Sequence, residues 1–253
     1  MSASQNSQPP VIVTAAILVI GDEILSGRTK DKNIGYIAEY LTNIGIELRE
    51  VRVVPDVTDE IVAALNALRA RYTYVFTTGG IGPTHDDITA DSVAAAFGVP
   101  IDYDPRAVAM MRERFSAEDL NEARMRMTRI PAGAELIANS ISKAPGFNIG
   151  NVYVMAGVPS IMQAMLDVVA PTLTTGAKIL SETVQAGLRE GDIGGPLAAV
   201  AKAHPGVSIG SYPFWSETGP DTNIVVRSRD AQQLQAAMAD VKKMIRDHGR
   251  PVS

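Results

Sequence analysis

The sequence contains no cysteine among its 253 residues. That absence excludes disulfides, thiolate metal sites and cysteine nucleophiles, and it fits a reducing compartment. Only three histidines are present, His85, His204 and His248, and they are too scattered along the chain to suggest a histidine-rich zinc site. We therefore expect a cytoplasmic protein that uses neither a disulfide framework nor a zinc centre of this kind.

An excess of basic residues is also missing. Lysine and arginine number 23 against 28 aspartates and glutamates, which gives a formal net charge of -5. Proteins that bind nucleic acid or anionic membranes usually carry a basic surface. The apolar run 11–20 is too short for a membrane span and follows no basic segment of the kind that begins a signal peptide. We expect neither nucleic acid nor a membrane as a partner.

The most informative stretch is 75–93, VFTTGGIGPTHDDITADSV, in which an apolar strand pattern runs into a glycine cluster and then a helical pattern. Gly79, Gly80 and Gly82 permit positive φ and close backbone approach, so their N–H groups can face an anion. In an α/β sheet such a loop lies at the carboxyl end of a strand, where ligands usually bind. Thr89 is the expected N-cap of the helix. The stretch predicts a loop that binds phosphate or carboxylate, with a spacing unlike the Walker or Rossmann motifs.

Acidic residues follow three of the predicted strands. Asp86 and Asp87 lie beside the glycines, and two carboxylates would repel a polyphosphate unless a divalent cation lay between them. Asp22 and Asp56 follow the first and second strands, and the carboxyl ends of parallel strands meet at one rim. Asp22, Asp56 and Asp87 therefore predict a site for a divalent metal, most simply Mg²⁺. The alternative interpretation is a capped, solvated turn with acids on the surface.

Apolar periodicity predicts strands and helices along the whole chain. The predicted strands are 11–20, 47–54, 74–78, 135–138, 151–155, 178–186, 207–212 and 223–227. The predicted helices are 31–44, 58–68, 89–97, 105–115, 120–127, 161–169, 192–203 and a closing helix with Leu234, Met238, Val241 and Ile245 on one face. The order of the first elements predicts a doubly wound, mostly parallel sheet in an α/β domain.

The domain boundaries follow from composition and element order. Residues 1–12 are expected to be a disordered lead-in. Residues 13–175 are expected to form the α/β domain, and 176–253 a small α+β subdomain with the order βαββα, with PTLTTG at 171–176 as the boundary.

Three smaller groups of residues carry predictions of their own. Thr58 is the expected N-cap of its helix. The methionines Met110, Met111, Met125 and Met127 are expected to be adaptable core or an oligomer face. The aromatic residues Tyr212, Phe214 and Trp215 are expected to lie in a core or an interface.

Six short motifs, in order along most of the chain, resemble one family. They are GDEILSG at 21–27, VVPDVTDEI at 53–61, TTGGIGPTHDDIT at 77–89, KAPGF at 143–147, AGVPSIM at 156–162 and HPGVSIGSYP at 204–213. The chain resembles the amino-terminal domain of the competence/damage-inducible protein A family, within the molybdopterin-binding-like superfamily that includes the molybdopterin adenylyltransferases. The resemblance covers about 13–250 and implies a three-layer α/β domain that forms homo-oligomers, either dimers or trimers.

The resemblance also implies roles for individual residues. Asp87 matches the magnesium-associated aspartate of the superfamily, and Asp56 matches the acid that follows the second strand. The resemblance implies that the phosphate or pterin is contacted by Gly79, Gly80, Gly82, Thr84, Gly157 and Pro159. Thr78, at the strand end, and Lys143, a cation in a turn, are further expected contacts. Two positions depart from the family pattern: Ile161 replaces a frequent glutamate, and the triplet 31–33 reads Asp, Lys, Asn in place of Asp, Thr, Asn.

The activity implied by the resemblance is that of a metal-dependent pyrophosphatase on ADP-ribose-like dinucleotides, with Asp22, Asp56 and Asp87 as catalytic metal ligands. Two alternatives remain open at this point: adenylyl transfer to molybdopterin in molybdenum cofactor biosynthesis, and a non-catalytic nucleotide-binding regulatory module. The separate amidohydrolase domain of the family would follow residue 253, so we do not expect its activity here.

Overall fold

A computed structural model describes residues 11–217 and 219–248. The chain divides into two compact units, one from Val11 to Gly176 and one from Ala177 onward. The expected disordered lead-in lies almost wholly outside the described residues. Within them, no helix is both long enough and apolar enough to cross a membrane.

The first unit is built on a six-stranded sheet with the order β2-β1-β3-β8-β7-β6. Its strands are β1 (Val13–Ile20), β2 (Ile46–Val54), β3 (Tyr74–Thr78), β6 (Glu135–Ile137), β7 (Gly146–Ile149) and β8 (Val152–Met155). Strands β2, β1, β3 and β8 pair in parallel, whereas β7 and β6 pair antiparallel. The expected mostly parallel sheet is thus confirmed, with an antiparallel edge.

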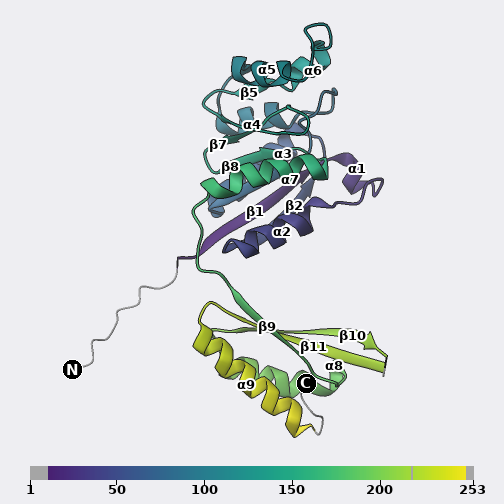
Figure 1. Cartoon of the computed structure of the whole chain (residues 1–253), viewed down its shortest axis with the longest axis vertical. Helices are drawn as coiled ribbons and strands as arrows, with labels where there is room; N and C mark the ends of the chain where they lie inside the picture. The colour runs from purple at the N-terminus through teal and green to yellow at the C-terminus, as the bar shows by residue number, and fades with distance from the viewer. Residues whose placement is uncertain (1–10, 218, 249–253) are drawn as a thin grey trace, which may run out of the picture. The chain divides into compact units, whose positions relative to one another are not determined.

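Helices cover both faces of this sheet (Figure 1). They are α1 (Asp22–Leu25), α2 (Asn33–Asn43), α3 (Thr58–Arg71), α4 (Thr89–Phe97), α5 (Pro105–Arg112), α6 (Glu122–Arg126) and α7 (Pro159–Val169), followed by the 3₁₀ turn η1 (Ala170–Thr172). Alternate residues of β1 point to opposite faces, so Leu18 packs in the cluster that contains α3 and α4, and Ile17 in the cluster that contains α2 and α7. A central strand covered on both sides reads as a continuous apolar run, and the fold has three layers.

Several local predictions were wrong. Thr58 is the first residue of α3 rather than its N-cap, because Val57 takes the extended cap conformation and makes no side-chain cap bond. The strands β4 (Ile101–Tyr103), β5 (Arg129–Pro131) and β7 were missed, since segments of three or four residues show too little periodicity for every such strand to be identified. The methionine prediction fared better: Met111 is buried in the core, as expected, and the other three methionines are half-buried.

The second unit is a small α+β fold with a three-stranded antiparallel sheet, ordered β10-β11-β9. Its elements are β9 (Leu180–Gln185), α8 (Glu190–Ala203), β10 (Ser208–Ser216), β11 (Gly219–Ser228) and α9 (Ala231–Asp247). Ile224 and Val226 pack with the two helices, whereas Trp215 is 82% exposed and Tyr212 is 48% exposed. These two aromatic residues therefore lie outside the core, and the other half of the expectation, that they lie in an interface, stays a prediction.

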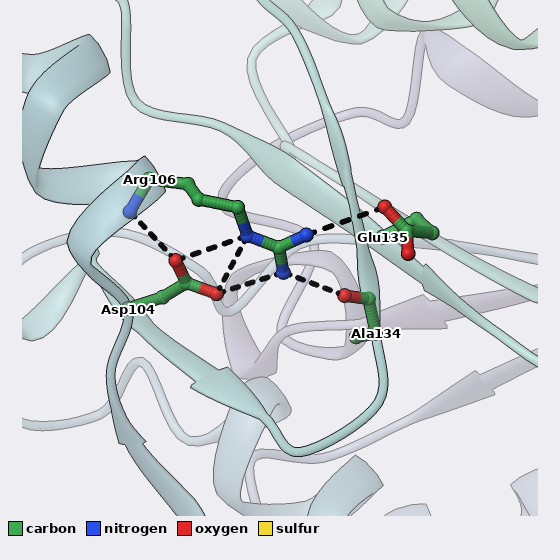
Figure 2. A network of polar contacts seen from close by, with 4 residues as sticks. All are labelled: Asp104, Arg106, Ala134 and Glu135. Atoms are coloured by element: carbon green, nitrogen blue, oxygen red, sulfur yellow. Dashed lines mark hydrogen bonds and ion pairs between the residues drawn. The ribbon is translucent and has the colours of Figure 1, made fainter.

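A polar network ties α5 to the strands beside it, and Figure 2 shows its four residues. Asp104 is the N-cap of α5 and accepts from the Arg106 backbone N–H at 2.7 Å. The Arg106 guanidinium donates to Asp104 at 2.8 Å, to the Ala134 carbonyl at 2.9 Å and to Glu135 at 3.3 Å. Hydrogen bonds from the Arg106 side chain hold the pKa of Asp104 below its usual range. The network joins the start of α5 to the segment that enters β6.

Asp104→Ala should lower the free energy of unfolding by about 1–2 kcal/mol, because the helix loses its cap. An Asp whose pKa is lowered in the folded state stabilises the fold above its unfolded pKa and loses that effect as pH falls through the folded pKa. The difference from wild type, measured by denaturant unfolding, should therefore shrink as the pH is lowered. Asp102→Ala, which removes a nearby exposed carboxylate, is the control. Equal losses in both variants would contradict a role for the cap.

Candidate functional site

The glycine loop, defined as residues 79–88, joins β3 to α4. Its backbone packs directly against the backbone at the ends of neighbouring strands. Gly79 has φ 105° and Gly80 has φ 65°, conformations that favour glycine. A Cβ at Gly79 would lie 2.1 Å from the Ile20 carbonyl oxygen, at the end of β1. The Gly79 N–H donates to the Met155 carbonyl, at the end of β8, at 3.3 Å. The loop therefore sits at the carboxyl ends of three neighbouring parallel strands, as predicted.

Thr89 secures this loop and does not cap α4, so the N-cap prediction was wrong. Its hydroxyl donates to the Gly79 carbonyl at 3.0 Å, and its backbone N–H donates to the Gly80 carbonyl at 3.0 Å. The N-cap position is Ile88, which makes no side-chain cap bond. A Cβ at Gly80 would lie 2.2 Å from the Thr89 hydroxyl oxygen. The threonine is buried against the loop because its hydroxyl supplies a donor that the loop carbonyl needs.

A tight turn brings Gly82, Thr84 and Asp87 together. Asp87 Oδ2 accepts from the Thr84 backbone N–H at 2.8 Å and from the Thr84 hydroxyl at 2.5 Å. A Cβ at Gly82 would lie 2.6 Å from the same carboxylate oxygen. One oxygen of the predicted metal ligand Asp87 is thus already engaged within the loop.

The acid rim, defined as Asp22, Glu23, Asp56 and Asp86, lies at the ends of β1 and β2 and on the glycine loop. The Asp22 backbone N–H donates to Asp56 Oδ2 at 2.9 Å, so the structure brings these two predicted residues together. Burial raises the pKa of Asp56, and the charges of Asp22, Glu23 and Asp86 raise it further, against the hydrogen bond from Asp22. The loop acid that acts on Asp56 in this way is Asp86, the neighbour of the predicted Asp87.

The loop after β8 meets the glycine loop from the other side. A Cβ at Gly157 would lie 3.3 Å from the Gly79 Cα, so the two backbones are nearly in contact. Asn33, the first residue of α2, donates from Nδ2 to the Gly157 carbonyl at 2.8 Å. Pro159 is the first residue of α7, and Ile161, which replaces the frequent glutamate, is half-buried against the core on that face. Sequence reasoning noted Asn33 only within a departure from the family pattern.

Two predicted ligand contacts are not free to meet a ligand: Thr78 is buried, and Lys143 is paired with another side chain. Thr78 is 1% exposed, and its hydroxyl finds no hydrogen-bond partner among residues 11–217 and 219–248. The Lys143 ammonium donates to Glu113 at 2.6 Å, so it would have to leave that ion pair to meet a phosphate. Their proposed roles in binding stay predictions.

A pocket opens beside the glycine loop and is formed entirely within the first unit. Its lining residues are Gly80, Ile81, Gly82, Asp87, Ala90, Asp91, Arg126, Met127, Arg129, Ile130, Pro145 and Phe147. Arg129 makes a bidentate pair with Asp91, at 2.9 and 2.7 Å. The sequence analysis did not single out the two arginines of this lining, Arg126 and Arg129. The run RMRMTR at 124–129 contains three arginines, and this basic cluster is the signal that could have found them.

The residues of the acid rim suit a hard divalent cation chemically. Among the described residues, no group of three His, Cys, Asp or Glu side chains is spaced to hold a metal ion. Mg²⁺, however, is usually bound by one or two carboxylates together with substrate phosphates and water, rather than by a cage of protein ligands. A cation at Asp56 would also relieve the repulsion that raises the pKa of that carboxyl group. The rim fits a metal whose coordination a phosphate completes.

Comparisons with known proteins divide the chain at the same place as its two units. Residues 16–175 match the family model "Probable molybdopterin binding domain", and residues 178–250 match "FAD synthase, middle domain". A protein of Aeropyrum pernix is 33% identical over 91% of this chain and 90% of its own length.

Two relatives are longer than this chain. A "CinA-like protein" of Desulfosudis oleivorans is 37% identical over 78% of this chain and 51% of its own length. A "Probable FAD synthase" of Caenorhabditis elegans is 30% identical over 93% of this chain and 50% of its own length. The chain thus spans about half of each.

One solved structure supports the same assignment. The crystal structure of the protein CinA, of unknown function, from Thermoplasma acidophilum is 33% identical, with a TM-score of 0.60, over 64% of this chain and 98% of that one. These matches confirm the resemblance that the motifs predict. The chain belongs to the molybdopterin-binding-domain family, and its first unit is a CinA-like member of that family.

Proposed function

We propose that this protein binds a nucleotide diphosphate at the glycine loop, with a divalent cation at the acid rim, and hydrolyses the pyrophosphate of ADP-ribose-like dinucleotides. The observation that carries the proposal is the half-buried Asp56 carboxyl group, held beside Asp22 and two further acids, Glu23 and Asp86, at the edge of a glycine-rich anion loop. A protein gains nothing in stability from such a grouping, and the chemistry it suits is that of a cation bridging to phosphate.

The residues of the chain take separate roles in this reaction. The N–H groups of the glycine loop orient the phosphates, and Asp87 holds the loop in shape through Thr84. Asp22 and Asp56 would hold the cation, which would supply neutralisation of phosphate charge and activation of a water molecule. Water adds across one P–O bond of the pyrophosphate bridge, so that ADP-ribose gives AMP and ribose 5-phosphate.

The similarity to a relative named as an FAD synthase fits this substrate class. FAD is itself a dinucleotide joined by a pyrophosphate, so a pocket for such a linkage is chemically appropriate in either protein.

The purified protein should release AMP from ADP-ribose with Mg²⁺, Mn²⁺ or Co²⁺, and the release should stop in EDTA. Asp22→Asn should slow it, because this exposed side chain loses a charged ligand while its backbone bond to Asp56 remains. Asp247→Asn, an exposed site on α9 in the other unit, is the matched control. AMP release is measured by chromatography. No AMP release by the wild type with any of the three metals would rule out hydrolysis, and equal rates in the wild type and Asp22→Asn would rule out a role for Asp22 in it.

A second candidate is a nucleotide-binding module without turnover. It is favoured by one observation, that the described residues contain no group of three side chains ready to hold a metal. Calorimetry that detects binding of ADP-ribose, together with no AMP in the assay above, would support this candidate over the enzyme.

A further inference from the structure

The pocket beside the glycine loop is distinct from the acid rim. The lining of this pocket contains Asp87 from the glycine loop, but none of the four residues that define the acid rim. Asp91 is paired with Arg129 through two hydrogen bonds, so the charges of these two side chains offset each other. Asp87 is held by the amide and hydroxyl of Thr84. Arg126 is the remaining charged side chain in the lining.

Arg126 is a cation with no hydrogen-bond or ion-pair partner among residues 11–217 and 219–248. It is half-buried at the last position of α6, and its Nε is buried with no hydrogen-bond partner among the described residues. A guanidinium carries five N–H donors. A donor that is buried away from water and has no acceptor destabilises the fold. Buried polar groups in native proteins almost always have partners, so an orphaned donor in a pocket lining calls for an acceptor that the chain itself does not supply.

The surroundings of Arg126 favour an anionic acceptor. The pocket lining includes two buried apolar residues, Ile130 at 5% exposure and Phe147 at 2% exposure, so part of it offers a bound group no polar partner. Interactions between charges are stronger where water is excluded. Gly80 and Gly82 place the backbone of the anion loop on the wall of the same pocket. A phosphoryl oxygen bound there would meet the loop and the guanidinium together.

We propose that Arg126 is a positioning residue that binds a phosphoryl oxygen of the nucleotide and so makes this pocket selective for an ionised phosphate. The proposal rests on the proposed function for the identity of the nucleotide, but it concerns binding and needs neither the metal nor turnover. Arginine suits this role because its planar fork matches phosphate geometry, which lysine does not reproduce.

Calorimetry in EDTA tests this inference with ADP-ribose and adenosine as probes. Arg126→Met removes the charge and keeps much of the apolar side chain, and it should weaken ADP-ribose binding about 10- to 100-fold. Arg126→Lys should restore part of the loss, leaving a deficit of about 3- to 10-fold. Adenosine has no phosphate, so its affinity should not change in either variant. Arg112→Met, at an exposed position that ends α5, is the control and should bind both probes as the wild type does.

The possible outcomes separate this inference from the proposed function. Unchanged ADP-ribose affinity in a folded Arg126→Met would overturn it, even if wild type hydrolyses ADP-ribose. So would equal losses for ADP-ribose and adenosine, or a wild type that binds neither. Selective loss of ADP-ribose binding would support it, even if no AMP is ever released. Thermal unfolding of each variant checks the fold, and Arg126→Lys carries the test should the methionine variant fail to fold.

Discussion

Asp56→Asn should reduce the hydrolysis of ADP-ribose by about two orders of magnitude or more, while making the metal-free protein more stable than wild type. The activity falls because the cation loses its half-buried carboxylate ligand, and metal stabilisation of a phosphoryl transition state is worth several kcal/mol, at about 1.4 kcal/mol for each factor of ten. The stability rises because the variant lacks a charge that burial and three neighbouring acids disfavour. The asparagine can keep the hydrogen bond from the Asp22 backbone N–H.

The pH dependence of this stability gain has a definite sign. The pKa of Asp56 is raised in the folded state, so the folded protein takes up a proton more readily than the unfolded chain. The unfavourable contribution of the ionised group is complete above the folded pKa and disappears below the unfolded pKa of about 3.9. The stability difference between variant and wild type should therefore shrink as the pH falls through that window. Protons and Mg²⁺ compete for the same carboxylate, so Mg²⁺ should stabilise wild type less at low pH.

Denaturant unfolding of both proteins, with Mg²⁺ and with EDTA, measures these effects beside the activity assay. Asp59→Asn in the first turn of α3 is the nearby control, and it should leave activity and the Mg²⁺ effect intact. A fully active Asp56→Asn would contradict the assignment of the acid rim. A variant that is inactive but also strongly destabilised would show instead that Asp56 has a structural role.

Gly79→Ala should destabilise the first unit by roughly 2–5 kcal/mol and prevent nucleotide binding. Two effects add: the positive φ of 105° is strained for alanine, and its Cβ would lie 2.1 Å from the Ile20 carbonyl oxygen. The atoms nearest this Cβ all belong to the backbone of Ile20, so no flexible side chain can move aside. The end of β1 and the loop would therefore have to separate. Thermal unfolding and ADP-ribose calorimetry measure the two consequences.

Gly133→Ala separates conformational strain from the steric clash. Gly133 also has positive φ, 83°, but a Cβ there would have nothing within 4 Å. It should lose only about 1–2 kcal/mol, the usual penalty of a left-handed conformation for alanine. If Gly79→Ala is no worse than Gly133→Ala, close packing of the loop on β1 is not what requires glycine.

Much of the fold followed from patterns within short stretches of the chain. The apolar run that became β1, the helical period of α2 and the glycines after β3 each depend on neighbouring residues, and each was predicted where it occurs. The meeting of Asp22 and Asp56 also followed, because parallel strands must present their carboxyl ends at the same edge.

The mistakes concern contacts between distant segments. Thr89 has the composition of a helix cap, yet its hydroxyl bonds the carbonyl of Gly79, ten residues earlier. Trp215 was expected in a core or an interface, and with 82% of it exposed it lies outside the core. In both cases the local propensity was sound and the tertiary context decided the outcome.

The glycine-rich stretch and its acids can be recognised from the sequence alone, because tolerance of positive φ and carboxylate chemistry are properties of individual residue types. The contacts of each acid depend on how one loop turns in space: Asp87 accepts from Thr84, and Asp86 adds its charge to those that raise the pKa of Asp56. The position of Arg126 beside that loop depends on folding 124–130 back against α4, a contact between segments more than 30 residues apart. Residue identity therefore supplies the chemistry of the site, and only long-range packing determines which groups can act together.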